Sequence, residues 1–241
     1  MDRSSLVNKY GELRRRLSAV ETLMLIKNQY TYSQISSITK LPTPVLSRYV
    51  KGHVLPALGR ADHLIEILGK EYLLNLIKNK IRVEENKIFD HSEVMNDIGL
   101  LEMIGKLVSH EFSELKVDKV LTIEVDGILP ASQVARAFNV KLVVAKSRKE
   151  MGIQEFEEVR RVYSSGAYSY VFIPKNTIKK SETVLIVDDA IRTGSTLETL
   201  FNICDSVGAE TVGVYALIGL KNLLSKVRKK VDFPVKTLIE L

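Results

Sequence analysis

A chain of 241 residues with 45% apolar and 27% charged residues has room for one large domain, or for a small and a medium one, in an ordinary folded protein. Its single cysteine, Cys204, excludes an internal disulfide, and no uninterrupted apolar stretch approaches the roughly 18 residues that span a bilayer. The first residues also lack the basic and then apolar pattern of a signal peptide. We therefore expect a cytoplasmic protein without a membrane partner.

Positive charge is concentrated in the first quarter of the chain. Residues 1–60 contain 10 Lys and Arg against 3 Asp and Glu, whereas the remainder contains 25 basic and 26 acidic residues. Such asymmetry indicates a nucleic-acid or other anionic partner for the first segment. A solvated basic face with no partner would have the same composition, so charge alone leaves both interpretations open.

Three helices are expected within this basic segment. Apolar residues recur at three- and four-residue spacing over residues 4–28, and shorter helices are expected over Ser33–Thr39 and Pro44–Lys51. Thr43 followed by proline is a favourable helix start. A short helix, a tight turn and a second helix are typical of a helix-turn-helix. A three-helix bundle used for dimerisation, or as a lid over an active site, has the same pattern.

If this segment binds double-stranded DNA, the helix that begins near Thr43 would enter the major groove. Arg48 is the best candidate for reading a base edge, because its planar fork of donors suits guanine. Basic side chains around the motif would contact phosphates. The predicted DNA contacts are Arg14, Arg15, Arg16, Lys40, Thr43, Ser47, Arg48, Lys51 and His53.

After a longer apolar helix over Ala61–Lys80 and a polar stretch at Arg82–Lys87, helices and strands alternate. Helices are expected over Val94–Phe112, Pro130–Phe138 and Ser195–Val207; strands over Val120–Ile123, Leu142–Ala145, Val184–Val187, Thr211–Ile218 and, at an edge, Val235–Glu240. Residues 147–172 are polar and rich in Ser and Tyr, as a hairpin or flexible arm would be. Apolar strands separated by helices predict an α/β fold with a parallel sheet. The expected domains are 1–60, a helical connector 61–88, and 89–241.

The residues that follow the strand at 184–187 carry recognisable chemistry. Asp188 and Asp189 come at its carboxyl end, where doubly wound sheets bind ligands. Gly194 allows a close backbone approach, and the N–H groups of the helix that begins near Ser195 form an anion site. Two carboxylates beside such a site fit ribose 5-phosphate, with its hydroxyls on the carboxylates and its phosphate on the loop. An ordinary strand–turn–helix with acidic turn residues is the alternative.

The stretch Val184-Leu-Ile-Val-Asp-Asp-Ala-Ile-Arg-Thr-Gly-Ser-Thr196 resembles the phosphoribosyl-pyrophosphate (PRPP) signature of type I phosphoribosyltransferases. The resemblance implies the type I phosphoribosyltransferase fold, preceded here by a small all-α helix-turn-helix domain. It also implies that PRPP binds with Mg²⁺, its ribose hydroxyls on the two aspartates and its 5′-phosphate on the loop. The residues predicted for this site are Asp188, Asp189, Ala190, Arg192, Thr193, Gly194, Ser195 and Thr196.

Two further segments resemble the pyrophosphate site of that family. Residues 124–131 resemble its pyrophosphate loop, and residues 146–150 resemble the basic partner of that loop. Physically, a loop with a glycine presents N–H groups while lysine and arginine supply charge. Asp126 departs from the small or polar residue expected there; it either helps to hold Mg²⁺ or weakens binding, and no set of metal ligands is identified. The predicted residues are Val125, Asp126, Gly127, Lys146, Arg148 and Lys149.

Within the family, residues 90–241 resemble the xanthine phosphoribosyltransferase and bacterial purine-repressor branch, on segments 121–124, 171–176 and 234–238. A helix-turn-helix before such a domain resembles archaeal regulators that are similar to orotate phosphoribosyltransferase. We therefore expect a homodimeric DNA-binding transcriptional regulator that senses PRPP, or a related nucleotide, as an effector and controls metabolic genes; residual glycosyltransferase activity is compatible with this role. The alternative is an active purine or pyrimidine phosphoribosyltransferase. RNA binding ranks last, because residues 1–60 show no aromatic-rich stacking platform.

Overall fold

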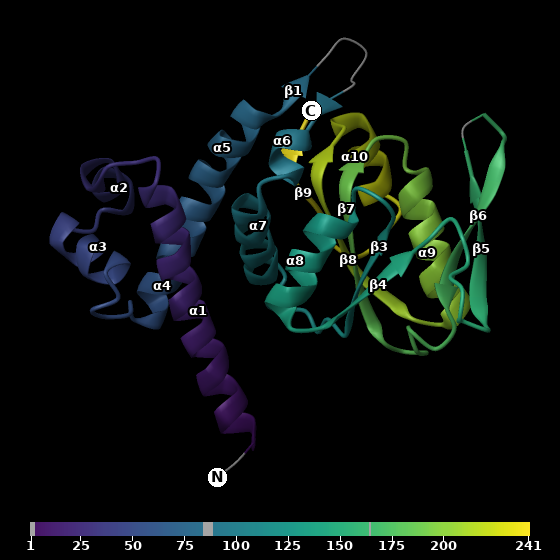
Figure 1. Cartoon of the computed structure of the whole chain (residues 1–241), viewed down its shortest axis with the longest axis horizontal. Coiled ribbons are helices and arrows are strands. Elements are labelled where there is room, and N and C mark those ends of the chain that lie inside the picture. Colours follow the sequence, from purple (N-terminus) through teal and green to yellow (C-terminus); the bar gives the residue numbers. More distant parts are fainter. Residues whose placement is uncertain (1–2, 84–88, 164) are drawn as a thin grey trace. The chain divides into compact units, whose positions relative to one another are not determined.

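The computed structural model describes residues 3–83, 89–163 and 165–241 (Figure 1). It divides into two compact units, Met1–Met103 and Ile104–Leu241, and the boundary falls within one helix. The polar stretch expected at Arg82–Lys87 lies largely outside the described residues.

The described part of the first unit is mainly helical. Its elements are α1 (Arg3–Lys27), α2 (Tyr32–Thr39), α3 (Thr43–Val50), α4 (Leu58–Ile67), the π-helical turn η1 (Leu68–Tyr72), α5 (Leu73–Lys80), the short strands β1 (Arg82–Val83) and β2 (Phe89–Asp90), and α6 (Ser92–Met95). The helices predicted over the basic segment are confirmed to within about a residue. Thr31 and Gln34 form a reciprocal cap at the start of α2, the Gln34 N–H donating to the Thr31 hydroxyl oxygen at 3.3 Å.

Two long helices predicted from the apolar pattern are interrupted. The helix expected over Ala61–Lys80 begins at Leu58 and contains a π-helical turn. The helix expected over Val94–Phe112 is instead two helices, α6 and α7 (Ile98–Glu111). The Asp97 carboxylate accepts a hydrogen bond from the Leu100 N–H at 3.1 Å, which caps the start of the second helix. An apolar period predicts the buried face of a helix but does not detect such a cap.

The second unit is built on a five-stranded parallel sheet in the order β4-β3-β7-β8-β9 (Figure 1). Its strands are β3 (Lys119–Ile123), β4 (Lys141–Ala145), β7 (Thr183–Ile191), β8 (Glu210–Gly219) and β9 (Val235–Glu240); its helices, after the end of α7, are α8 (Ile128–Phe138), α9 (Ser195–Val207) and α10 (Lys221–Arg228). Strands β5 (Phe156–Val162) and β6 (Tyr168–Pro174) form an antiparallel hairpin, which confirms one form predicted for residues 147–172. The predicted parallel sheet flanked by helices is confirmed, and α10 was missed.

Both faces of the central strands are buried. Figure 1 shows α8 on one side of the sheet and α9 with the β5–β6 hairpin on the other. On the α9 side, Leu121, Ile186 and Val214 from three strands pack with Leu200 and Cys204 of the helix. This arrangement explains why the strands read as continuous apolar runs. It also brings the carboxyl ends of β3, β4 and β7 to one edge of the sheet.

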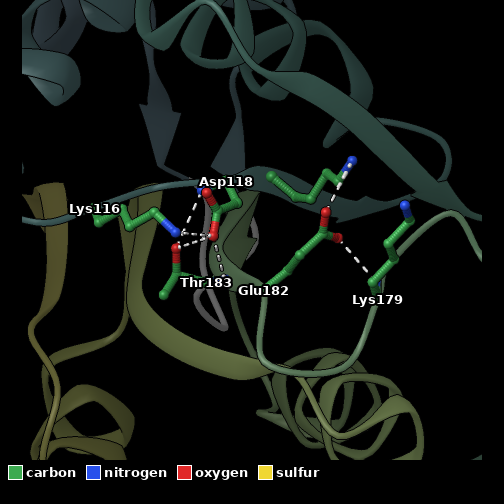
Figure 2. Close-up of polar contacts among 6 residues, drawn as sticks. Lys116, Asp118, Lys179, Glu182 and Thr183 are labelled. Carbon is green, nitrogen blue, oxygen red and sulfur yellow. Dashed lines mark hydrogen bonds and ion pairs between the residues drawn. The ribbon is translucent and has the colours of Figure 1, made fainter.

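At the amino ends of β3 and β7, a polar network joins the two strands (Figure 2). The Asp118 carboxylate accepts hydrogen bonds from the Thr183 N–H at 3.0 Å, the Thr183 hydroxyl at 2.9 Å and the Lys116 ammonium at 2.9 Å. Beside it, Glu182 accepts a bond from the Lys179 N–H at 2.8 Å. These hydrogen bonds lower the pKa of Asp118 to about 2, the Thr183 N–H making the largest contribution. The network therefore holds the sheet together at the edge opposite its carboxyl ends.

Candidate functional site

Strand β7 positions the acidic pair. The strand was predicted to end at Val187 but continues to Ile191, so Asp188 and Asp189 lie within it. Pairing with β8 continues past Asp188, opposite Ala216, to Ile191, opposite Gly219, which extends the strand beyond its apolar run. Asp188 is buried, with 3% of its surface exposed, and accepts a hydrogen bond from the Asp189 N–H at 3.0 Å.

Burial has an electrostatic consequence for this pair. Desolvation raises the pKa of Asp188 well above its usual value, and the neighbouring charge of Asp189 raises it further. Asp188 thus holds its proton more tightly than an isolated aspartate does. A ligand that donates hydroxyl hydrogens to this pair would compete with that proton.

The loop after β7 forms a turn that leads into α9. Gly194 has φ of 83°, in the left-handed region that favours glycine, and stands at the N-cap of α9 without a side-chain cap. The hydroxyl groups of Thr193 and Ser195 lie 3.0 Å apart. A Cβ at Gly194 would be 3.5 Å from Leu223 of α10, so this helix packs directly behind the loop. Backbone N–H groups and hydroxyls at a helix start suit an anion.

A second loop, residues 124–127 after β3, faces the acidic pair. A Cβ on Gly127 would lie 2.4 Å from the Thr122 hydroxyl oxygen and 2.7 Å from Oδ1 of Asp188, so only glycine fits this approach. The Glu124 carboxylate accepts hydrogen bonds from the hydroxyl and backbone N–H of Ser147, and both lower its pKa. The pyrophosphate loop predicted from sequence therefore lies beside the predicted ribose-binding acids.

These two loops and the acidic pair enclose a cavity of about 390 Å³. Its lining includes most of the residues predicted for PRPP: Val125, Asp126, Gly127, Asp188, Asp189, Ala190, Arg192, Thr193, Gly194, Ser195 and Thr196. It also contains Glu124, the first residue of the predicted pyrophosphate loop, and two residues of the β5–β6 hairpin, Arg161 and Tyr163, that were not among the predicted contacts. The hairpin residues were missed because no local pattern marks them as ligand contacts and the hairpin adjoins the cavity only through tertiary packing.

The three predicted basic residues after β4 do not line this cavity. Lys146 forms an ion pair with Glu150, and Lys149 with Glu158. The Lys149 ammonium also lies 5.2 Å from the centre of the Phe172 ring. Arg148 is exposed. The structure therefore brings the acids and both loops together but leaves this basic cluster beside them.

The basic residues of the first unit are partly engaged within it. Arg15 forms an ion pair with Asp62 at 2.8 Å, and Arg16 donates to the Pro56 carbonyl oxygen at 2.7 Å. Arg14 lies over the Tyr10 ring at 6.0 Å. Of the other residues predicted to contact DNA, Ser47 is half-buried, and Lys40, Thr43, Arg48, Lys51 and His53 are exposed. Part of the charge excess thus stabilises the unit itself.

Comparison with known proteins identifies the second unit. The sequence profile described as "Phosphoribosyl transferase domain" matches residues 92–240. Xanthine phosphoribosyltransferases of Alkaliphilus metalliredigens and Clostridium tetani are each 33% identical, over 61% and 64% of this chain and 76% and 89% of their own. The adenine phosphoribosyltransferase of Rhodothermus marinus has 25% identity and a TM-score of 0.61, over 70% of this chain and 99% of its own. That of Thermoanaerobacter pseudethanolicus, with 21% identity and a TM-score of 0.62, shows the same fold.

These relatives contradict the predicted function. They are enzymes, so the prediction of a DNA-binding transcriptional regulator was wrong, and the contacts assigned to DNA have no support. The effector role predicted for PRPP has no support, since phosphoribosyltransferases use PRPP as a substrate, with Mg²⁺. None of the helices in the described parts of the chain is long and apolar enough to cross a membrane. With the matched profile, the parallel sheet and its relatives in agreement, the chain belongs to the phosphoribosyltransferase family.

Proposed function

We propose that this chain transfers ribose 5-phosphate from PRPP to a purine base and releases pyrophosphate. The observation that carries the proposal is one cavity in which two aspartates lie between an anion-binding loop and a glycine loop. A 6-oxopurine of the xanthine type is the proposed base, because two sequence relatives, matched over 76% and 89% of their own length, are xanthine phosphoribosyltransferases.

In the proposed complex, the ribose hydroxyls donate to Asp188 and Asp189. Transfer requires the bond between the ribose C1 atom and pyrophosphate to weaken, which places positive charge on the ribose ring. Fixed carboxylates next to that ring stabilise the charge as it develops. Because burial raises the pKa of Asp188, binding of the diol strengthens as the pH rises and the carboxyl group ionises.

The 5′-phosphate would bind at the start of α9. The hydroxyl groups of Thr193, Ser195 and Thr196 and the free backbone N–H groups of the first turn supply donors there. Gly194 lets the backbone approach the phosphate without a Cβ in the way. This contact holds the ribose while the bond at C1 breaks.

Pyrophosphate would lie over residues 125–127 with Mg²⁺. Magnesium is commonly held by one or two carboxylates together with substrate phosphate oxygens, and Asp126, exposed at the cavity wall, fits that donor set. When bound, the ion supplies positive charge that neutralises the departing pyrophosphate. Gly127 keeps the loop close to Asp188, so that pyrophosphate and ribose share one cavity.

Lys146 and Lys149 would complete the pyrophosphate site by leaving their carboxylate partners. The side chains of both ion pairs are between 38% and 50% exposed. Exposed pairs of this kind contribute only about 0–1 kcal/mol, so exchanging a carboxylate for a pyrophosphate oxygen costs little. Arg148, exposed between them, would add a third positive charge.

The domain boundaries 1–60, 61–88 and 89–241 remain a proposal, supported at the second boundary by a family match that begins at residue 92. A homodimer and a cytoplasmic location likewise stay predictions. Light scattering coupled to size-exclusion chromatography measures the oligomeric state, and fractionation of cells that contain the protein measures its location.

The direct test incubates the chain with PRPP, Mg²⁺ and a panel of xanthine, hypoxanthine, guanine, adenine, uracil and orotate. Pyrophosphate release and nucleotide formation are measured together. We expect turnover with xanthine above the other bases, and none in a variant with both Asp188→Asn and Asp189→Asn. Asp205→Asn, on the exposed side of α9, serves as the matched control. No pyrophosphate release with any base would contradict the proposed transfer.

A further inference from the structure

Arg161 joins the β5–β6 hairpin to the first turn of α9. It lies in β5, its side chain lines the cavity, and its Nη2 atom donates to the Thr196 hydroxyl oxygen at 2.9 Å. Thr196 is the second residue of α9, directly after the Gly194 turn. The guanidinium group is thus placed at the end of the cavity formed by the anion-binding loop.

One N–H donor of the same guanidinium group is available to a ligand. Its Nε atom is buried and has no hydrogen-bond partner among the described residues. A guanidinium group carries five N–H donors and stays charged at every physiological pH. Leaving one donor buried without an acceptor costs free energy unless a ligand completes the set. The acceptor that fits the planar fork of donors is a phosphate or carboxylate oxygen.

The distribution of charge around the cavity determines where such an anion can bind. Four carboxylates line it, from Glu124, Asp126, Asp188 and Asp189, and they disfavour any anion that lacks a nearby cation. Arg161 is held at the loop after β7 by its bond to Thr196, whereas the predicted pyrophosphate loop follows β3. A phosphate on the loop after β7 is therefore the group that Arg161 can neutralise.

We propose that Arg161 binds the 5′-phosphate of PRPP and thereby couples the β5–β6 hairpin to the occupied loop. The inference rests on the proposed function, since it takes PRPP as the ligand. Tyr163, two residues further along the chain, also lines the cavity, and the centre of its ring lies 5.2 Å from the Arg161 guanidinium carbon. Phosphate binding would fix this pair, and with it the hairpin wall of the cavity.

Calorimetry on the full chain separates the two ends of the site by using ribose 5-phosphate and pyrophosphate with Mg²⁺ as separate probes. Arg161→Gln is expected to weaken ribose 5-phosphate binding by about tenfold or more, because a charged hydrogen bond is lost. Pyrophosphate binding should change by less than about twofold. In turnover assays the same variant should raise KM for PRPP more than it lowers kcat. Arg161→Lys, which keeps the charge but not the fork, should recover part of the affinity and also covers the case in which Arg161→Gln does not fold.

Arg160→Gln is the matched control. Its side chain is exposed on the same hairpin, with the guanidinium carbon 4.3 Å from the Tyr168 ring centre, and it does not line the cavity. It should bind both probes like the unaltered chain. A general loosening of the hairpin would affect both arginine variants and both probes, and that result would overturn the proposed contact.

The remaining outcomes distinguish this inference from the proposed function. If the unaltered chain and Arg161→Gln bind ribose 5-phosphate equally, Arg161 is not a phosphate ligand, and the transfer reaction stands. If the unaltered chain binds the sugar phosphate through Arg161 but turns over no base, the contact stands and the transfer fails. If the unaltered chain binds neither ribose 5-phosphate nor PRPP, both are overturned.

Discussion

Asp118 offers a quantitative test of how the sheet is held together away from the cavity. Its carboxylate accepts three hydrogen bonds, two from Thr183 and one from Lys116, and its pKa falls from an ordinary 3.8 to about 2. That difference corresponds to roughly 2 kcal/mol favouring the folded state when the carboxyl group is ionised. The Lys116 side chain is 76% exposed, so solvent screening reduces the expected value to about 1–2 kcal/mol.

Asn at this position mimics the protonated carboxyl group, so Asp118→Asn should remove that stabilisation. For a chain of this length, a loss of about 1–2 kcal/mol lowers the melting temperature by roughly 2–8 °C. Because the folded pKa lies below the unfolded one, the stabilisation is complete above a pH of about 4 and is lost as the pH falls toward 2. The difference from the unaltered chain should therefore be constant from pH 7 to 5 and shrink below pH 4.

Urea unfolding followed by circular dichroism, at several pH values between 7 and 3, measures this difference. Asp232→Asn, an exposed carboxylate between α10 and β9, is the control and should stay within about 0.5 kcal/mol of the unaltered chain. An Asp118→Asn variant as stable as the unaltered chain at pH 7 would refute the reasoning. So would a difference that persists undiminished to pH 3.

Three further predictions concern the cavity and the core. Gly127→Ala should weaken PRPP binding by more than about tenfold in calorimetry, because its Cβ would meet Thr122 and Asp188. The control is Gly59→Ala, which has open space around it and should have a melting temperature no lower than that of the unaltered chain. Asp188→Asn should raise the melting temperature of the ligand-free protein at pH 7 while abolishing PRPP binding. The reason is that ionising a carboxyl group whose folded-state pKa is raised costs stability as the pH rises above 3.8. An unchanged or lower melting temperature would contradict this. Burial raises the pKa of Cys204 to about 11, so a thiol reagent should label it at pH 8 only after denaturation, and rapid labelling of the native protein would show that the core assignment is wrong.

The sequence was a good guide to the sheet because the central strands are buried on both faces. Continuous apolar runs then coincide with strands, as over Val120–Ile123 and Thr211–Ile218, each within about a residue of its observed bounds. Prediction failed where a side chain, rather than the apolar period, decides the boundary. Asp97 divides one predicted helix into two by capping the second. The amphipathic helix α10 was missed because only Leu224 of its eight residues is fully buried.

The candidate site was predictable where its chemistry lies within one contiguous segment. The acidic pair and Thr193–Thr196 are neighbours in sequence, so strand, turn and helix start could be read together. Arg161 lies more than thirty residues away along the chain and reaches Thr196 only because the hairpin packs on α9. No local pattern marks it, since one arginine in a polar strand resembles any solvated residue.

Function was misjudged for a different physical reason. The helix pair α2 and α3 has the expected form, but a short helix, a turn and a second helix bury the same few apolar residues whether or not they contact DNA. The charge excess was equally ambiguous, since the Arg15 guanidinium is held by Asp62 and Arg16 by the Pro56 carbonyl group. Shape and net charge report on stability and solubility as readily as on a partner. The cavity is more specific because parts of it act against stability. Burial raises the pKa of Asp188, the Arg161 Nε atom has no acceptor among the described residues, and a Cβ at Gly127 would crowd Thr122 and Asp188. Such costs persist in a fold when a ligand offsets them. This cavity offers carboxylates, a cation and an anion-binding loop to a sugar phosphate.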